Sequence, residues 1–231
     1  MDLSRFTTIS FDCYGTLIDW EAGILPVLRA LLAQHKQSLA DSDILALYGE
    51  FEAQVESGPY RSYREVLQSV IRAFGKRLNF HPAPAEIRSL DESVITWPPF
   101  ADTVAALRQL KNRYKLAIIS NIDDDLFAET HKLLGVDFDA VVTAEQARSY
   151  KPSLHNFELA LEKLAIPRAQ LLHAAQSIYH DVVAARSLGI ATVWVNRKSA
   201  RPGIGAVRPA ADQPDLEVPD LAALAALAAP A

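Results

Sequence analysis

The sequence has 231 residues, of which 50% are hydrophobic and 22% are charged, a composition that excludes a disordered or fibrous chain. A chain of this length forms one large domain, or a core domain with a smaller inserted one, rather than two large domains. The formal net charge is −5, and no run of Lys or Arg is long enough to neutralise a row of phosphates, so we expect no nucleic-acid partner.

Two further features of the composition predict where the protein works. Cys13 is the single cysteine in the sequence, which excludes an internal disulfide framework and fits a reducing cytoplasm. No stretch approaches the roughly 20 apolar residues that cross a bilayer, and the first five residues contain no long apolar signal region. We therefore expect a cytoplasmic protein with no membrane partner.

The first predicted element is a strand over Phe6–Phe11, a β-branched and aromatic run that stops at Asp12. The interval 18–98 that follows has no convincing strand, but it contains three helical patterns, Leu25–His35, Asp43–Val55 and Tyr63–Leu78. Pro98 and Pro99 end this interval, because two prolines cannot continue a helix. We interpret 18–98 as an inserted helical subdomain.

After this insert, short apolar runs alternate with amphipathic helical stretches. The apolar runs do not alternate in polarity, as expected for parallel strands covered on both faces, and they are Tyr114–Ser120, Ala140–Thr143, Leu171–Ala175 and Ala191–Val195. The helical stretches are Ala101–Asn112, Asp124–Leu134, Leu154–Leu164 and Asp181–Leu188. Beyond them, Pro202–Pro219 is predicted to be a loop and 220–229 a helix.

This alternation predicts an α/β fold. We expect a doubly wound, Rossmann-like parallel sheet built from 1–17 and 99–231, with the helical subdomain inserted between these two segments. In such a sheet, ligands bind beyond the carboxyl ends of the strands. The polar residues that follow predicted strands, or precede a later helix, are Asp12, Ser120, Asn121, Lys151, Ser177 and Asp181.

Four segments at these strand ends resemble the ordered motifs of the haloacid dehalogenase superfamily. They are FDCYGTL around Asp12, IISN ending at Asn121, SYKP around Lys151 and SIYHD ending at Asp181. Each segment alone is a weak signal, but four in the correct order are specific. The helical insert resembles the cap subdomain of the same family, so the resemblance implies a core at 1–17 and 99–231 and a cap at 18–98.

The residue chemistry fits a covalent mechanism. The Asp12 carboxylate would attack the substrate and form an ester or acyl phosphate, which divides one displacement into two steps. Thr16 and Ser120 offer hydroxyl groups to hold the nucleophile or the substrate, and Lys151 would offset the negative charge around Asp12. The resemblance implies that Asp181 orients or activates the water that hydrolyses the intermediate.

Tyr14 distinguishes attack on carbon from attack on phosphorus. Phosphatases of this superfamily carry an Asp at that position, which protonates a basic alkoxide leaving group, whereas a halide leaves without a proton. Gln176 and Ser177 also stand where magnesium-dependent relatives carry a further acidic residue, and Mg²⁺ prefers several carboxylate oxygens. We therefore expect no metal and no cofactor, in a protein resembling type II (L-)2-haloacid dehalogenases that releases halide from a small 2-halocarboxylic acid.

Two positions depart from the pattern of such dehalogenases. Gly49 stands near the place of a halide-binding Arg in the cap, and Ile178 stands where an Asn is usual. Arg61 and Arg64 are candidates to reach the substrate from the cap instead. The residues that we expect to bind substrate are therefore Tyr14, Thr16, Asn121, Arg61, Arg64 and Ser177.

Two alternatives to dehalogenation stay open at this point. The first is a phosphate monoester hydrolase of the same superfamily, which would need Mg²⁺. The second is a binding protein that keeps the fold but has lost turnover, because fold resemblance does not decide function. The resemblance also implies a small-molecule carboxylate as substrate and a homodimer as the assembly.

Overall fold

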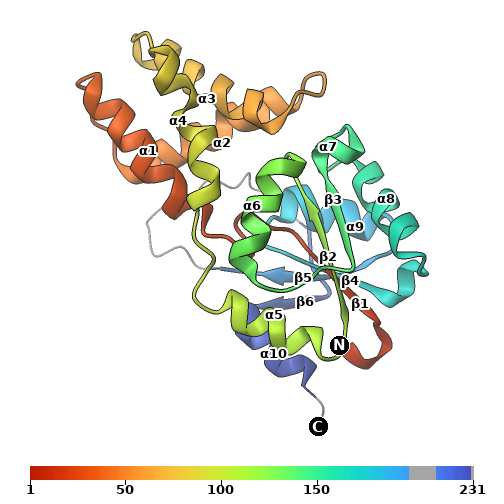
Figure 1. The fold of residues 1–231 in the computed structure, drawn as a ribbon. Helices are drawn as coiled ribbons and strands as arrows, with labels where there is room; N and C mark the ends of the chain where they lie inside the picture. Colours follow the sequence, from red (N-terminus) through yellow and green to blue (C-terminus); the bar gives the residue numbers. More distant parts are fainter. Residues whose placement is uncertain (198–211, 230–231) are drawn as a thin grey trace.

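The computed structural model of the chain describes residues 1–197 and 212–229. Its centre is a six-stranded sheet in the order β3-β2-β1-β4-β5-β6, in which every neighbouring pair of strands is parallel (Figure 1). The strands are β1 (Thr8–Phe11), β2 (Lys115–Ser120), β3 (Ala140–Thr143), β4 (Leu171–Ala175), β5 (Ala191–Val195) and β6 (Leu216–Val218).

The strand order confirms the predicted doubly wound α/β fold. From β1 the chain proceeds outward to β2 and β3, then returns to the other side of β1 and proceeds through β4, β5 and β6. The direction of winding therefore reverses between β1 and β4, whose register pairs Ser10 with His173. A reversal of this kind leaves a crevice at the carboxyl ends of the two strands, which is where ligands bind in open α/β sheets.

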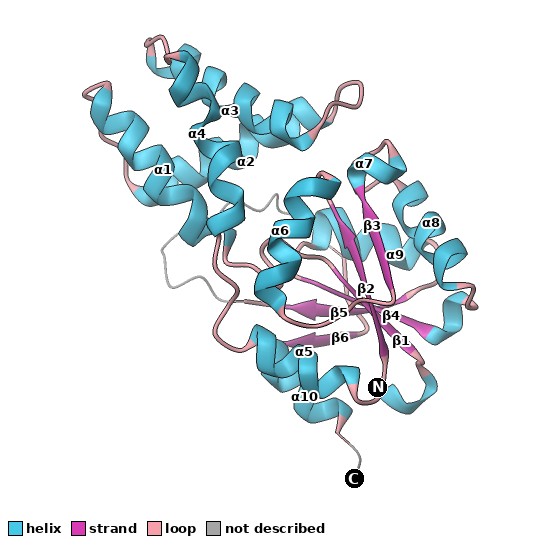
Figure 2. Ribbon diagram, in the orientation of Figure 1, coloured by secondary structure: helices cyan, strands magenta, loops and turns pink. Residues whose placement is uncertain are grey.

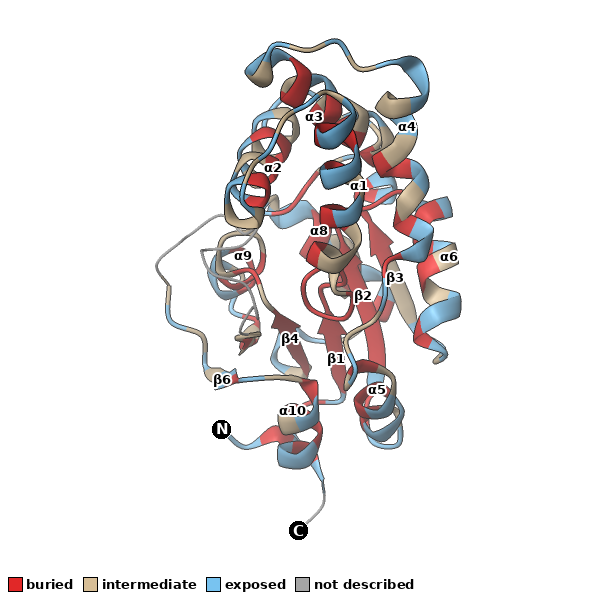
Figure 3. Ribbon diagram, turned by 90° about the vertical axis from the view of Figure 1, so that its left-hand side faces the viewer, coloured by how far each residue is buried: buried red, intermediate tan, exposed pale blue. Residues whose placement is uncertain are grey.

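Helices cover both faces of the sheet, and the side chains of β2 alternate between them. Leu116 and Ile118 belong to the core cluster that includes residues of α5 (Thr103–Lys111) and α10 (Leu221–Ala228). Ala117 and Ile119 belong to a second cluster, with α8 (Leu154–Leu164) and α9 (Val183–Ser187). Successive side chains of a strand point to opposite faces, so an apolar strand buries both of them. Figure 3 shows the central strands β1 and β4 as buried along their length.

A group of helices between β1 and α5 projects beyond the carboxyl ends of the strands (Figure 2). Its members are α1 (Trp20–Gln34), α2 (Asp41–Glu56), α3 (Tyr63–Leu78) and α4 (Pro84–Ser93), followed by the 3-10 turn η2 (Val94–Thr96). The start of α3 is fixed by a capping box, in which the Ser62 hydroxyl accepts from the Glu65 amide and the Glu65 carboxylate accepts from the Ser62 amide.

A single carboxylate connects these helices to the sheet. Asp123 lies at the start of α6 (Asp124–Leu134), yet its oxygens accept from the backbone amides of Tyr63 (2.7 Å) and Arg64 (3.0 Å), in the first turn of α3. The first amides of a helix have no partner within the helix, and a negative charge beside them is stabilising. The position of α3 over the sheet is therefore held by an acidic residue of the core.

Several short elements differ from the predictions. The helices α4 and α7 (Ala144–Ala147) were not predicted, and the expected helix from Asp181 is instead a π-helical turn, η4 (Ile178–Val182), followed by α9. Of the expected loop Pro202–Pro219, the stretch 202–211 lies outside the described residues. In the described remainder of that expected loop, Leu216–Val218 forms the edge strand β6, which is too short to produce a sequence pattern. The 3-10 turns η1 (Leu3–Arg5) and η3 (Arg168–Gln170) complete the described elements.

Candidate active site

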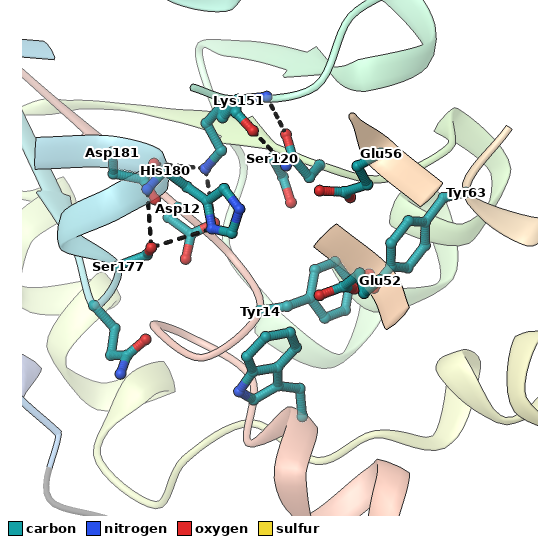
Figure 4. Close-up of a pocket in the computed structure, with 13 residues that line it drawn as sticks. Asp12, Tyr14, Glu52, Glu56, Tyr63, Ser120, Lys151, Ser177, His180 and Asp181 are labelled. Atoms are coloured by element: carbon teal, nitrogen blue, oxygen red, sulfur yellow. Dashed lines mark hydrogen bonds and ion pairs between the residues drawn. The ribbon is translucent and has the colours of Figure 1, made fainter. Parts of the chain in front are cut away.

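A cavity lies at the carboxyl ends of β1, β2 and β4, beneath α2 and α3 (Figure 4). It is lined by residues of all four motif segments together with residues of the inserted helices. The lining residues are Asp12, Tyr14, Trp20, Glu52, Glu56, Tyr63, Ser120, Asn121, Lys151, Gln176, Ser177, His180 and Asp181. This position is the crevice that the strand order predicts.

Lys151 is the centre of the polar network in this cavity. Its ammonium group donates to Asp12 Oδ1 (2.9 Å), Asp181 Oδ1 (2.6 Å) and the carbonyl oxygen of Ile119 (2.8 Å). The side chain is 1% exposed, so these three bonds use every proton of a buried ammonium. Burial lowers the pKa of Lys151, but the two carboxylates outweigh this and the pKa is raised, which keeps the group charged.

Asp12 is held from two sides. Its second oxygen, Oδ2, accepts from the Thr16 hydroxyl at 2.6 Å, while Oδ1 faces Lys151. Gly15 has a φ of 91°, in the left-handed region, and so lets the chain turn back immediately after the strand to bring Thr16 under the carboxylate. Burial raises the pKa of Asp12 and the nearby Asp181 adds to this, although Lys151 and Thr16 act in the opposite direction.

Asp181 is oriented by a buried histidine. His173 Nε2 lies 3.0 Å from Asp181 Oδ1, and His173 Nδ1 lies 2.9 Å from the hydroxyl of Ser10. Burial raises the pKa of Asp181, but the charge of Lys151 and the hydrogen bond from His173 together hold that pKa below its ordinary value. The other oxygen, Oδ2, is buried and has no hydrogen-bond partner among the described residues. Asp181 thus presents a carboxylate oxygen with unused acceptor capacity.

The polar residues at the carboxyl ends of β2 and β4 have two roles: some hold neighbouring residues in position, and one has a hydroxyl in the cavity that no described residue engages. The Asn121 amide accepts from the Lys151 backbone N–H (2.7 Å) and donates to its carbonyl (3.3 Å), so it positions the lysine. The Ser177 hydroxyl accepts from the His180 backbone N–H at 3.0 Å and so begins η4. The Ser120 hydroxyl is buried, lines the cavity and has no partner among the described residues, which leaves it available to a substrate.

Tyr14 and Thr16 both follow β1, as Asp12 does, but of these two residues Tyr14 lines the cavity and Thr16 does not. Tyr14 lines the cavity with its ring, because its hydroxyl is bonded to the Thr130 hydroxyl at 2.8 Å. Thr16 is fully buried and is not among the lining residues. Its hydroxyl donates to Asp12 and accepts from the Gln176 backbone N–H (2.9 Å), so the structure places it behind the nucleophile, not against a substrate.

The structure does not bring Arg61 or Arg64 to the cavity. The Arg64 guanidinium pairs with Asp125 (2.6 Å) and Asp91 (3.5 Å), carboxylates that lie outside the lining. Arg61 is exposed, and its carbonyl oxygen accepts from the Tyr150 hydroxyl. Arg61 lies in the loop before α3, and Arg64 lies in the first turn of that helix. The expectation that they contact the substrate is therefore corrected.

Sequence reasoning missed two groups of residues. His173 sits inside an apolar strand, and the signal was the pair of polar residues, Ser10 and His173, in two neighbouring buried strands. Glu52 and Glu56 lie on the cavity face of α2. The signal was that they follow the buried Tyr48 at successive intervals of four residues. These spacings mark one helix face, but they do not show what that face meets.

Among the described residues, no group of three or more His, Cys, Asp or Glu side chains is arranged to hold a metal ion. Two of the cavity carboxylates, Asp12 and Asp181, share one ammonium, and Gln176 and Ser177 add no charge. This donor set does not match the several carboxylate oxygens that Mg²⁺ prefers. Over the same residues, no helix has the length and apolar character of a membrane span.

Comparisons with known proteins agree with this geometry. The sequence model of a family described as haloacid dehalogenase-like hydrolase matches residues 6–189. An (S)-2-haloacid dehalogenase of Pseudomonas putida is 28% identical over 200 residues, which cover 83% of this chain and 86% of that protein. The pyrophosphatase PpaX of Bacillus velezensis is 28% identical over 194 residues, with 83% of each chain covered.

A solved structure extends the similarity to the fold. The L-2-haloacid dehalogenase of Xanthobacter autotrophicus, with chloropropionic acid covalently bound, superposes with a TM-score of 0.81 and covers 96% of this chain and 98% of that one. The sequence identity of that pair is 21%, so this likeness concerns the arrangement of the helices and strands.

Proposed function

This chain belongs to the haloacid dehalogenase-like hydrolases, and we propose that it displaces halide from a small 2-halocarboxylic acid through an ester formed on Asp12. The observation that carries the proposal is the cluster of Asp12, Lys151 and Asp181 at the cavity. In it, one buried ammonium lies 2.9 Å and 2.6 Å from the two carboxylates. The (S)-2-haloacid dehalogenase relative adds support for this substrate class.

In the first step, an oxygen of the Asp12 carboxylate attacks C2 of the substrate. A carbon–oxygen bond forms, the carbon–halogen bond breaks, and the halide leaves with the electron pair. Halide is a weak base, so this step needs no proton donor, and the bonded Tyr14 hydroxyl need not supply one. Lys151 favours the ionised form of Asp12 and orients it, while the unpartnered Ser120 hydroxyl is available to hold the substrate.

In the second step, water attacks the carboxyl carbon of the Asp12 ester. The ester bond breaks on the carbonyl side, so the oxygen attached to C2 in the 2-hydroxy acid comes from Asp12. One water proton ends on that hydroxyl group, the other is released, and Asp12 returns as a carboxylate that carries the oxygen of water. Asp181 Oδ2, buried and without a partner among the described residues, is positioned to accept the first proton.

Halide release tests the proposal. The protein is incubated with chloroacetate and with each enantiomer of 2-chloropropionate and 2-bromopropionate, with and without EDTA. We expect halide from at least one acid, unaffected by EDTA, and a loss of at least about 10³-fold in Asp12→Asn, since the amide is not a nucleophile. Absence of halide from every acid between pH 5 and 10 would contradict the proposal.

Phosphoester hydrolysis is the second candidate, and the similarity to a pyrophosphatase favours it. It predicts release of phosphate from p-nitrophenyl phosphate or pyrophosphate that requires added Mg²⁺ and stops with EDTA. Tyr14 argues against this reaction, because its hydroxyl is bonded to Thr130 and its pKa is raised well above the usual value by burial. Such a group is a poor proton donor to an alkoxide at neutral pH.

Three further features belong to the same proposal. We assign residues 18–98 as a cap subdomain over the core formed by 1–17 and 99–231, because α1, α2 and α3 contribute residues to the lining of the cavity. A cytoplasmic location is supported by the single, buried thiol of Cys13. A homodimer is supported by the family resemblance.

A further inference from the structure

Over the part of the chain that the structure describes, the lining of the cavity offers an anion a single fixed positive charge. Lys151 is the only residue with a fixed positive charge among the described residues of the lining. Its three N–H bonds already reach Asp12, Asp181 and the carbonyl of Ile119. A substrate carboxylate, or a halide leaving C2, therefore cannot receive a direct hydrogen bond from this ammonium without displacing one of these partners.

The wall opposite Lys151 carries two carboxyl groups instead of a cation. Glu52 and Glu56 lie four residues apart on α2, so they share one helix face, and Figure 4 shows both across the cavity from Asp12. Glu52 is 6% exposed, and its Oε1 accepts from the hydroxyls of Tyr48 (2.7 Å) and Tyr63 (2.7 Å). Glu56 has no hydrogen bond or ion pair among the described residues.

Ionised forms of this pair conflict with an anionic substrate. Asp12 and Asp181 carry two negative charges against the single positive charge of Lys151. Two more carboxylates facing the same space would repel an incoming anion in a setting that screens charges weakly. Burial raises the pKa of Glu52 to about 7, and burial together with the charge of Glu52 raises the pKa of Glu56 well above its usual value. The pair therefore has access to its uncharged form near neutral pH.

We propose that Glu52 and Glu56 form the anion subsite of this cavity, as neutral carboxylic acids that donate O–H bonds to the substrate carboxylate or the departing halide. The inference rests on the proposed function. Because two hydroxyls already donate to Glu52 Oε1, the proton of Glu52 resides on Oε2. A buried carboxylic acid kept neutral can donate a hydrogen bond to an anion, and the anion in turn stabilises the protonated form. Anion binding is therefore linked to proton uptake.

Other titratable groups also face Glu52 and Glu56, and their effects on the pH dependence of anion binding must be distinguished from those of the pair. The pKa values of Tyr48, Tyr63 and Tyr150 are raised by burial, so these phenols stay neutral in the relevant range. Asp12, Asp181 and Lys151 form the opposite wall, where the pKa of Asp181 is lowered and that of Lys151 is raised, so both of these groups favour their charged forms. The remaining group is the imidazole of His180, which lines the cavity and would weaken anion binding in the same direction if it lost a proton.

The test is the pH dependence of anion affinity between pH 6 and 8.5, measured by calorimetry with two probes, bromide and 2-hydroxypropionate. In the wild type we expect the Kd of at least one probe to rise roughly tenfold per pH unit above 7. In Glu52→Gln/Glu56→Gln the Kd should be constant over this range and at least about tenfold lower than wild type at pH 8.5. A response to bromide alone assigns the subsite to the halide, and a response to 2-hydroxypropionate alone assigns it to the carboxylate.

Two control variants locate the effect. Glu50→Gln removes a carboxylate from the exposed side of the same helix, where it pairs with Arg77, and should keep the pH dependence of the wild type. His180→Gln should also keep it, and its loss there would overturn the assignment to the glutamates. An anion Kd that is flat or falls with pH in the wild type would do the same.

These outcomes are independent of the test of the proposed function. Halide release combined with a flat anion affinity would contradict the subsite alone. Anion binding with the expected pH dependence, in a protein that releases no halide from any 2-haloacid, would contradict the proposed reaction and leave the subsite standing.

Discussion

At the scale of single residues, Lys151 supplies the positive charge that makes the burial of the Asp12 and Asp181 carboxylates tolerable. Two carboxylates and one ammonium are removed from water together, and each charge is tolerable only because the others are present. Asp181 keeps a lowered pKa in spite of its burial because of Lys151 and His173. The lysine therefore has a structural role in addition to its electrostatic effect on the nucleophile.

Replacing Lys151 with Met should reveal both roles. The substitution leaves two buried carboxylates without compensation, so we expect a loss of about 3–5 kcal/mol in the free energy of unfolding and loss of halide release. Urea unfolding at pH 7 measures the first effect. Lys132→Met is the matched control, because that lysine pairs with Glu129 on an exposed helix surface and should change stability by less than about 1 kcal/mol. Equal effects of the two substitutions would contradict this account.

The sequence predicts the cavity residues that follow strands of the sheet better than the cavity residues of α2. Asp12, Ser120 and Asp181 follow parallel strands directly or after a short turn, and the topology of the sheet alone brings such positions together. Glu52 and Glu56 reach the same cavity from a helix whose placement depends on tertiary contacts. No local pattern encodes those contacts, and the same limit explains why Arg61 and Arg64 were wrongly expected at the substrate.

At the scale of elements, the contact between Asp123 and the start of α3 fixes the inserted helices over the sheet. The carboxylate accepts from two amides of that helix, at 2.7 Å and 3.0 Å, and is almost completely buried. It has the function of a helix cap, although it comes from a segment 60 residues further along the chain. Loss of the cap would affect the wall of the cavity that includes Tyr63.

Asp123→Ala should lower the free energy of unfolding by about 1–2 kcal/mol, the usual cost of losing a helix cap. It should also raise the KM for a 2-haloacid more than it lowers kcat, because it disturbs the wall opposite the nucleophile. Steady-state kinetics and urea unfolding check both statements. Asp125→Ala, which removes an exposed ion pair with Arg64 and a local hydrogen bond from the Leu126 backbone N–H, should have little effect on either quantity.

Three long helices and the short strands β3, β4 and β5 were predicted at their observed bounds, whereas the start of α1 and several short polar elements were not. The helices α3, α6 and α8 begin and end at the predicted residues, because their apolar spacing and their capping residues agree. The helix α4 is mostly polar and begins at Pro84, so it lacks the pattern of a buried face. The π-helical turn η4 inserts a residue into the helical repeat just before α9, and sequence periodicity does not register such a change.

At the scale of the whole molecule, the buried acid on α2 makes stability depend on pH. The pKa of Glu52 is raised from 4.5 to about 7 in the folded protein, so the folded state binds more protons than the unfolded state between these values. Stability from this group is complete below pH 4.5 and is lost as the pH rises toward 7. A cavity prepared for an anion thus lowers the stability of the protein at neutral pH.

Glu52→Gln should therefore stabilise the protein by about 2–3 kcal/mol at pH 8 and have little effect at pH 4.5. The amide keeps an oxygen for the hydroxyls of Tyr48 and Tyr63, so the local packing is preserved. Urea unfolding of the wild type and the variant at both pH values gives the comparison. A stabilisation of the same size at pH 4.5 and pH 8 would show that the effect does not come from ionisation.

The central claim is that the oxygen delivered to C2 comes from Asp12, and a single turnover in H₂¹⁸O tests it most directly. Protein in excess over a 2-haloacid substrate is allowed to react once, and the product and the peptide that contains Asp12 are analysed by mass spectrometry. We predict a 2-hydroxy acid whose new hydroxyl oxygen is ¹⁶O, together with one ¹⁸O in the peptide of Asp12. A product that carries ¹⁸O, with an unlabelled peptide, would mean that water attacks the substrate directly and would contradict the account.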